Sequence, residues 1–168
     1  MTVRPEQPAD HDAARMVHRS AFGENSPEAG LVDALRAAGS HVAELCLVAE
    51  SAGEVVGHIF FSRARLDSGD DVLALAPMAV LPEWQRQGVG SRLVEASLQR
   101  AAETNYPLVV VVGHPSYYPR FGFEPAGGHG IVAPWDIPPE AWMVHRLPAY
   151  RREARGTVTY PEAFDAVT

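Results

Sequence analysis

The chain has 168 residues, and its 21 acidic and 14 basic residues give it a formal net charge of −7 at pH 7. This charge argues against a nucleic-acid-binding protein, which must neutralise phosphates, and no apolar run approaches the ~20 residues that cross a membrane. The chain begins without a signal sequence, and its single cysteine, Cys46, cannot form an internal disulfide. We therefore expect one cytoplasmic domain covering residues 1–168.

The first half of the chain predicts two helices followed by a strand hairpin. Asp10 and Ser26 precede the helical segments as capping residues. The turn sequence at 51–53, Ser-Ala-Gly, joins two apolar runs, the first of which places Cys46 in a buried strand. The predicted segments are a strand at 2–4, helices at 10–22 and 27–38, and strands at 44–50 and 55–64.

The second half of the chain continues as strand, helix and strand. Leu93, Val94 and Leu98 recur at helical spacing. The run at 108–112 is apolar throughout, which is typical of a strand buried on both faces. No repeat or linker divides the chain, so the pattern predicts a single α/β domain. The predicted segments are a strand at 71–80, a helix at about 89–103 and a strand at 108–112.

Residues 77–91 read P-M-A-V-L-P-E-W-Q-R-Q-G-V-G-S, an apolar strand that leads through a glycine-containing loop into a helix. In this order the N–H groups of the loop and the positive end of the helix dipole converge on one volume, which suits a polyphosphate. A side chain at Gly88 or Gly90 would hold the backbone away from an anion or forbid a positive φ. The chain lacks the lysine of a P-loop and the third glycine of a dinucleotide fingerprint.

What remains is Q-x-x-G-x-G from Gln85 to Gly90, which follows M-A-V-L-P-E-W and resembles the pyrophosphate loop of the GNAT acyltransferases. Tyr118 stands four residues before Gly122-Phe123, which resembles the Y-x-x-x-G-F element that closes the coenzyme A site in that family. G-T-V-T-Y-P-E-A-F at 156–164 is similar to one subgroup, the compact bacterial predicted N-acetyltransferases. The resemblance covers almost the whole chain. It implies an α/β fold with a mixed, largely antiparallel central sheet flanked by helices.

The resemblance implies that acetyl-CoA is the acyl donor and that its pantetheine arm lies beside the strand ending at 78–80. The strand must then leave its neighbour and free backbone groups, which Pro77 favours because it has no N–H for a sheet ladder. A free N–H there would also stabilise the oxyanion that forms on attack. The implied cofactor-binding residues are Met78, Ala79, Val80, Gln85, Arg86, Gln87, Gly88, Val89, Gly90 and Ser91.

By the same resemblance, Tyr118 is the catalytic residue that protonates the departing coenzyme A thiolate. A phenol with a pKa of about 10 stays protonated at neutral pH and is suited to this role. Tyr117 is the neighbouring alternative for the general acid. Packing at a helix end is the alternative role for Tyr118.

The general base is left unassigned by the sequence. Many GNAT enzymes carry a glutamate on the strand before the phosphate loop, where this chain has Leu75. His58 and His114 are the histidines available to replace it, although a lone histidine in a strand is more often structural. The other groups considered are Glu24 and Glu28, between the first two helices, and His145, which we expect to be structural.

Other patterns indicate neither metal nor hydrolase chemistry. The seven histidines lack H-x-x-x-H spacing, and no G-x-S-x-G is present. The four arginines within 146–155 fit solvated surface charge better than a site for the 3′-phosphate of coenzyme A. Trp84, Trp135 and Trp142 fit ordinary packing better than an acceptor site, and the loop at 135–139 is on the expected acceptor side.

These patterns predict an N-acetyltransferase that moves an acetyl group from acetyl-CoA to the primary amine of a small molecule or a peptide by direct attack. The alternative is a non-catalytic acyl-CoA-binding or sensing module, which Leu75 keeps open and Tyr118 argues against. Two further alternatives stay open: that the acyl donor carries a longer acyl chain, and that the protein forms a homodimer. We expect no metal, nucleic-acid or membrane partner.

Overall fold

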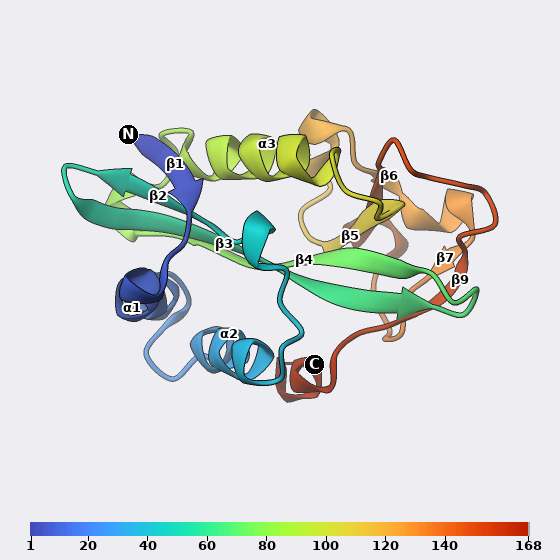
Figure 1. Ribbon diagram of the computed structural model, residues 1–168, viewed down its shortest axis with the longest axis horizontal. Coiled ribbons are helices and arrows are strands. Elements are labelled where there is room, and N and C mark those ends of the chain that lie inside the picture. Colours follow the sequence, from blue (N-terminus) through green and yellow to red (C-terminus); the bar gives the residue numbers. More distant parts are fainter. Residues whose placement is uncertain (168) are drawn as a thin grey trace.

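A central, mostly antiparallel sheet separates helix α3 from helices α1 and α2 in the computed structural model, which describes residues 1–167 (Figure 1). The strand order is β1-β2-β3-β4-β5-β8-β6, with β9 beside β3 and β7, and the pairs β4–β5 and β7–β9 are parallel. The expected mixed sheet flanked by helices is confirmed. The strands are β1 (Thr2–Pro5), β2 (Leu47–Ser51), β3 (Glu54–Leu66), β4 (Asp71–Val80), β5 (Leu108–Val112), β6 (Glu124–Pro125), β7 (Ile131–Val132), β8 (Trp142–Arg146) and β9 (Gly156–Thr159); the helices are α1 (His11–Phe22), α2 (Pro27–Ala37) and α3 (Val89–Ala101).

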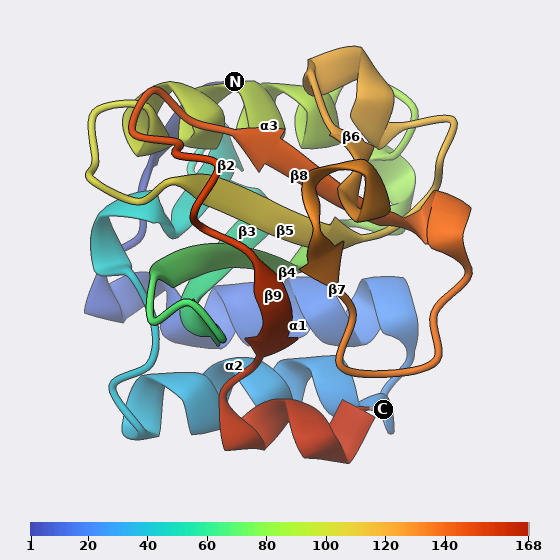
Figure 2. The ribbon, with the colours of Figure 1, turned by 90° about the vertical axis from the view of Figure 1, so that its right-hand side faces the viewer.

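Helical layers cover both faces of the sheet. The C-terminal 3-10 turn, Glu162–Val167, lies beside α2 on the face that α1 and α2 cover, and α3 covers the other face (Figure 2). Because both faces are covered, the central strand β3 is buried continuously over residues 55–62. Its side chains alternate between the two faces: Phe61 joins the core that contains Leu93 of α3, and Phe60 joins the core that contains Leu35 of α2.

The helices begin at the predicted places, but the predicted capping bonds are not formed. Asp10 and Ser26 occupy the N-cap positions of α1 and α2 without a capping hydrogen bond from either side chain. Both carboxylate oxygens of Asp10 accept hydrogen bonds from Arg4 instead, and one of them also accepts from the Gln7 N–H. The Asp10 side chain therefore stabilises the segment between β1 and α1 and does not stabilise the first turn of α1.

The prediction that Cys46 lies in a strand was wrong. Cys46 is fully buried, but it follows a 3-10 turn at Ala43–Leu45, and strand pairing begins only at Leu47. Its thiol lies 3.4 Å from the carbonyl oxygen of Val42. The apolar run at 45–48 enters the core before it enters the sheet, so hydrophobicity alone misplaces the start of the strand.

Among the described residues, no strand pairs with the last part of β4 on one of its sides. β4 pairs with β5 at Leu73 and Ala74, opposite Val109 and Val110, and the described pairing stops there. On its other side, the register with β3 shifts at the segment that contains Pro77, where β4 carries one extra residue. The bulge that Pro77 favours is present on the β3 side, and the edge of β4 beyond Ala74, on the β5 side, is open where the cofactor is expected.

Candidate active site

The backbone of β4 presents hydrogen-bonding groups along its open edge. The Leu81 N–H donates to the Val56 carbonyl oxygen at 2.9 Å, which fixes the alternation of the antiparallel ladder. Ala79 therefore directs its backbone groups towards β3, and Met78 and Val80 direct theirs towards the open edge. The Gln85 side-chain amide donates to the Val80 carbonyl oxygen at 2.9 Å. The open edge thus keeps the backbone groups of Met78 and the N–H of Val80 for a ligand.

The loop after β4 turns its backbone into the start of α3. Arg86 has φ +62° and Gly88 has φ +83°, both in the left-handed region. Gly88 is the N-cap of α3, whose first four N–H groups lack partners within the helix. Alternating left-handed residues turn successive N–H groups to one side and form an anion-binding concavity. The loop therefore has the geometry that a phosphate site requires.

Glycine is needed at position 90 because neighbouring side chains lie close to its backbone, and not because the backbone adopts a positive φ there. A β-carbon at Gly90 would lie 3.1 Å from the Tyr117 hydroxyl oxygen and 3.6 Å from Cε of Met78. The Tyr117 hydroxyl also lies 3.4 Å from Oγ of Ser91. Tyr117, which was predicted only as the alternative general acid, thus occupies the space above the first turn of α3.

A cavity of about 560 Å³ lies over this loop and the open edge of β4. Its walls include all the predicted cofactor residues except Gln87, whose side-chain amide donates to the Glu83 carbonyl oxygen at 2.9 Å. Trp84 and Phe22 also line the cavity. The predicted residues that line it are Met78, Ala79, Val80, Gln85, Arg86, Gly88, Val89, Gly90 and Ser91.

Tyr118 begins a 3-10 turn after β5 and packs deep in the site. It is 8% exposed, and its ring makes edge-to-face contacts with Tyr117 and Phe123 at centroid distances of 5.1 and 5.4 Å. Burial, with a smaller contribution from Tyr117, raises the pKa of Tyr118 to about 12. A β-carbon at Gly113 would lie 2.6 Å from Cδ2 of Tyr118 and closer still to Cε2. Gly113 was not predicted as a site residue, although a glycine at the end of the apolar strand 108–112 was the available signal.

A second cavity, of about 1080 Å³, joins the first. The two share Phe22, Met78, Gln85, Arg86 and Tyr117 along their common border. The second cavity continues past Tyr118 between α2, β4, the loop at 135–137 and the C-terminal turn. The geometry therefore offers one cavity for a phosphate-bearing ligand and an adjoining one for a second molecule.

His58 does not face either cavity. It is fully buried, with Nε2 2.7 Å from Oε2 of Glu6 and Nδ1 2.8 Å from Nε2 of His18. Burial, together with the charges of His58 and Arg36, lowers the pKa of His18 to about 3. His58 therefore belongs to a buried polar chain beneath α1, and its position excludes direct contact with a substrate in these cavities.

The titratable groups that line the second cavity are His114, Glu28 and Asp136, together with Arg86 and three tyrosines, Tyr117, Tyr118 and Tyr160. Glu24, which lies on the exposed turn between α1 and α2, lines neither cavity. Leu75 lines the second cavity, so an apolar side chain occupies the position where the resemblance leads one to seek a glutamate. His145 lies outside both cavities and packs against Phe123, 5.4 Å between ring centroids.

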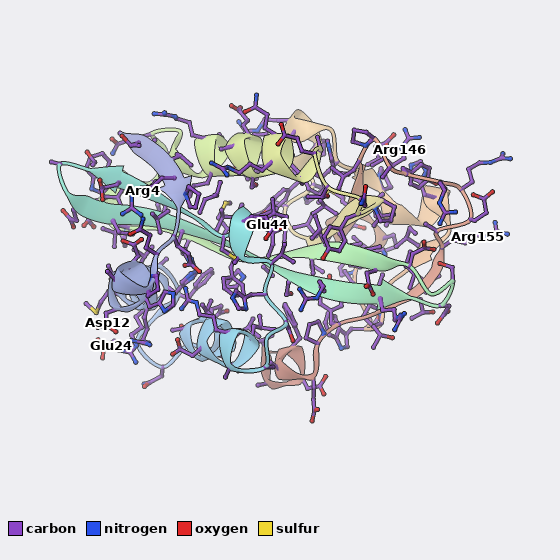
Figure 3. All side chains as sticks on the ribbon, in the orientation of Figure 1. Arg4, Asp12, Glu24, Glu44, Arg146 and Arg155 are labelled. Atoms are coloured by element: carbon purple, nitrogen blue, oxygen red, sulfur yellow. The ribbon has the colours of Figure 1, made fainter. Side chains whose placement is uncertain are left out.

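The arginines within 146–155 also lie outside both cavities. Arg146 pairs with Glu124 at 2.9 Å. Arg146 and Arg155 lie at the opposite end of the molecule from Glu24 (Figure 3). Among residues 1–167, no group of three or more His, Cys, Asp or Glu is placed to hold a metal ion, and no helix is long and apolar enough to cross a membrane.

Comparison with known proteins gives one consistent result. The model of the family described as "Acetyltransferase (GNAT) domain" matches residues 43–125. The chain is 42% identical over 148 residues to the uncharacterized N-acetyltransferase YjhQ of Escherichia coli K12, across 84% of this chain and 81% of that relative. It is 37% identical over 150 residues to the uncharacterized N-acetyltransferase YhbS of the same strain, across 88% of this chain and 87% of that relative.

Two solved structures match along almost the whole chain. The crystal structure of YhbS from E. coli in complex with CoA superimposes with a TM-score of 0.88 at 34% identity, covering 98% of this chain and 91% of that one. A GNAT family acetyltransferase from Brucella melitensis in complex with acetyl-CoA gives a TM-score of 0.80 at 30% identity, covering 98% and 97%. These likenesses favour an acetyltransferase with acetyl-CoA as donor over a non-catalytic sensing module.

Proposed function

The chain belongs to the GNAT family of acyl-CoA-dependent acetyltransferases, and we propose that it moves an acetyl group from acetyl-CoA to a primary amine by direct attack. In this reaction the amine nitrogen forms a bond to the acetyl carbon, the carbon–sulfur bond breaks, and the amine loses a proton while the sulfur gains one. The observation that carries the proposal is the common border of the two cavities at Met78 and Tyr117. Donor and acceptor can meet there without a carrier residue.

Direct attack is supported by the position of the single cysteine. Cys46 is fully buried outside both cavities, and burial raises the pKa of its thiol to about 12. A thiol that stays protonated and inaccessible is a poor nucleophile. A covalent acyl-enzyme on this cysteine is therefore disfavoured.

The residues of the smaller cavity fit acetyl-CoA, which when bound supplies an activated thioester. We assign the pyrophosphate to the backbone amides between Arg86 and Ser91, where Gly88 holds the left-handed turn. We assign the pantetheine arm to the backbone groups of Met78 and Val80 on the open edge of β4. A backbone N–H on this edge also suits the stabilisation of negative charge that develops on the thioester oxygen during attack.

We assign the general acid to Tyr118. Its raised pKa means that the hydroxyl holds its proton throughout the neutral range, so it can donate to the leaving sulfur. Tyr118 and Met78 both line the larger cavity, and Met78 also lines the smaller one, where the thioester would lie. Tyr117, whose hydroxyl lies near Ser91 over the start of α3, is better placed to contact the cofactor than to protonate the sulfur.

Calorimetric titration with acetyl-CoA, coenzyme A and a longer acyl-CoA, followed by thiol release across a panel of amines, tests the function. Saturable binding of acetyl-CoA with amine-dependent thiol release is the expected result. Binding without release from any amine would support a sensing module instead. Failure to bind any acyl-CoA would contradict the assignment of the smaller cavity.

A further inference from the structure

We propose that the acceptor is an apolar primary amine whose ammonium group is recognised by Glu28 and whose hydrocarbon or aromatic body fills the larger cavity. This inference rests on the proposed function and names the substrate class of the same site. Three features support it: the apolar composition of the cavity walls, the buried Glu28 carboxylate oxygen that lacks a hydrogen-bond partner among the described residues, and the distribution of charge along the two joined cavities.

The walls of the larger cavity beyond Tyr118 are made mainly of carbon. Trp135, Tyr160 and Phe164 form one continuous aromatic wall, with ring centroids 4.7 Å apart between the first two and 4.8 Å apart between the last two. The aliphatic residues that also line the cavity are Leu31, Leu75, Ala76, Pro77, Val112, Ile137 and Val167. Such walls favour a ligand with an apolar body, because burial of apolar surface is the main source of binding free energy.

The size of the cavity points the same way. Its volume of about 1080 Å³ is far larger than a methylamine or an ethanolamine needs. Small ligands bind through few atoms and leave such a cavity largely unfilled. Phe164 and Val167 line this cavity from the C-terminal turn, and that turn lies beside α2 (Figures 1 and 2). A substrate must therefore extend from the reacting nitrogen towards this turn to contact the whole wall.

Glu28 is the polar exception within this lining. It lies in the first turn of α2 and is half-buried, and its Oε2 atom is shielded from solvent without a hydrogen-bond partner among the described residues. No other residue of the described chain both lines the cavity and leaves a buried side-chain polar atom unsatisfied. A buried carboxylate oxygen without a partner is costly, and a substrate ammonium in the cavity is a group that compensates this cost.

Charge along the joined cavities orients the two substrates. Glu28 and the exposed Asp136 contribute negative charge to the larger cavity, and Arg86 contributes positive charge on the border with the smaller one. A cationic amine is attracted to the first region and an anionic donor to the second. Acceptors with their own carboxylate, such as free amino acids, are repelled by Glu28 and Asp136. Polyamines would bury further ammonium groups that have no carboxylate partner among the apolar walls, and burying an unpaired charge is costly.

The experiment compares amines of two kinds on the wild type and on Glu28→Gln. Phenethylamine, tryptamine and hexylamine represent apolar monoamines, and ethanolamine, spermidine and glycine represent the others. Glu24→Gln is the matched control, since it removes the same charge four residues earlier in the chain, from a side chain outside both cavities. Acetyl-CoA affinity is measured calorimetrically in every preparation.

We expect the highest kcat/KM with the apolar monoamines. Glu28→Gln should raise the KM for these amines by roughly ten-fold to a hundred-fold, the effect of losing one hydrogen bond to a charged group. The KM for acetyl-CoA should not change, and Glu24→Gln should behave as the wild type. A preference for ethanolamine, spermidine or glycine would overturn the inference, as would an unchanged KM for phenethylamine in Glu28→Gln.

A second measurement needs no variant and so does not depend on whether Glu28→Gln folds. In the wild type with coenzyme A bound, phenethylamine should bind at least ten-fold more tightly than its neutral analogue 2-phenylethanol, because the analogue lacks the ammonium. Equal affinities would contradict the role of Glu28. Loss of acetyl-CoA binding, or absence of thiol release with every amine, would instead contradict the proposed function itself.

Discussion

The ring of Tyr118 lies directly against the backbone of Gly113, at the point where β5 ends. A β-carbon at Gly113 would lie 2.6 Å from Cδ2 of Tyr118, a separation that real β-carbons essentially never show. The φ angle of Gly113 is not in the positive range, so the need for glycine comes from space alone. The absence of a β-carbon at position 113 therefore allows the ring of the proposed general acid, Tyr118, to lie where it does.

Gly113→Ala should lower turnover through Tyr118 without touching the cofactor. The added methyl group must push the ring aside, and general acid catalysis is typically worth ~10² or more in rate. We expect kcat to fall by about that factor while the acetyl-CoA dissociation constant changes by less than about three-fold. Gly127→Ala is the control, because its new β-carbon would meet no atom within 4 Å and Gly127 has no positive φ. An unchanged kcat in Gly113→Ala would show that the ring position is not critical.

Tyr118→Phe removes the hydroxyl and keeps the ring packing. It should reduce kcat by roughly 10² with little change in acetyl-CoA affinity, and Tyr117→Phe should alter affinity more than turnover. The pKa of about 12 adds a second check. In the wild type, the rate should rise with pH as the amine deprotonates, and no fall caused by loss of the Tyr118 proton should occur below about pH 10. Equal kcat values for Tyr118→Phe and the wild type would move the acid to water or Tyr117.

Gly88→Val should abolish acetyl-CoA binding in a folded protein. A β-branched side chain at φ +83° strains the backbone by about 1–2 kcal/mol and forces the loop to change shape. Gly53→Val is the matched control: Gly53 has φ +78° with open space around it and lies in the β2–β3 turn, outside both cavities. Both variants should lose similar thermal stability, measured by circular dichroism, and only Gly88→Val should lose affinity. Retained affinity would remove the phosphate assignment.

The elements that carry the proposed donor site were predictable because their signals are local. Pro77 and the glycines of 85–90 act on the backbone within a few residues of themselves, and the amphipathic pattern of α3 is visible in the sequence alone. The acceptor side could not be predicted in the same way. β6 and β7 have two residues each, which is too short for periodicity, and the aromatic wall joins Trp135 to Phe164 across the chain. The structural role that the sequence favoured for His58 agrees with its buried position, but alternation along β3 could not show which way it faces because both faces of the strand are buried.

The buried chain of His18, His58 and Glu6 should make stability depend on pH. Burial, then the charges of His58 and Arg36, lowers the pKa of His18 to about 3 in the folded state, against about 6.5 when it is unfolded. Between these values the unfolded chain binds a proton that the folded chain does not, so acid favours unfolding. This contribution to stability is complete above about pH 6.5 and is lost as the pH falls below it.

The lowered pKa of Glu6 acts in the same direction at lower pH. Burial alone would raise the pKa of this carboxyl, but its hydrogen bonds and charge interactions with His58 and Arg36 outweigh that effect. Its contribution is lost only as the pH falls below the ordinary range of a glutamate, at about 4.3. The two groups therefore act in different pH windows. The range from 7.5 to 5.5 reports on His18 together with His145, whose pKa is also lowered by burial.

Urea denaturation at pH 7.5 and pH 5.5 measures the His18 contribution. The free energy of unfolding should decrease by about 1 kcal/mol between the two from this histidine alone. His18→Leu replaces the buried ring with an apolar side chain and should flatten the difference, although it lowers stability at both values because Nδ1 of His58 loses its partner. His11→Gln, which changes a histidine outside the buried chain at the start of α1, should leave the difference unchanged. If His18→Leu kept the full pH dependence, the proton uptake on unfolding would have to come from other groups, and the buried chain would have no part in acid stability.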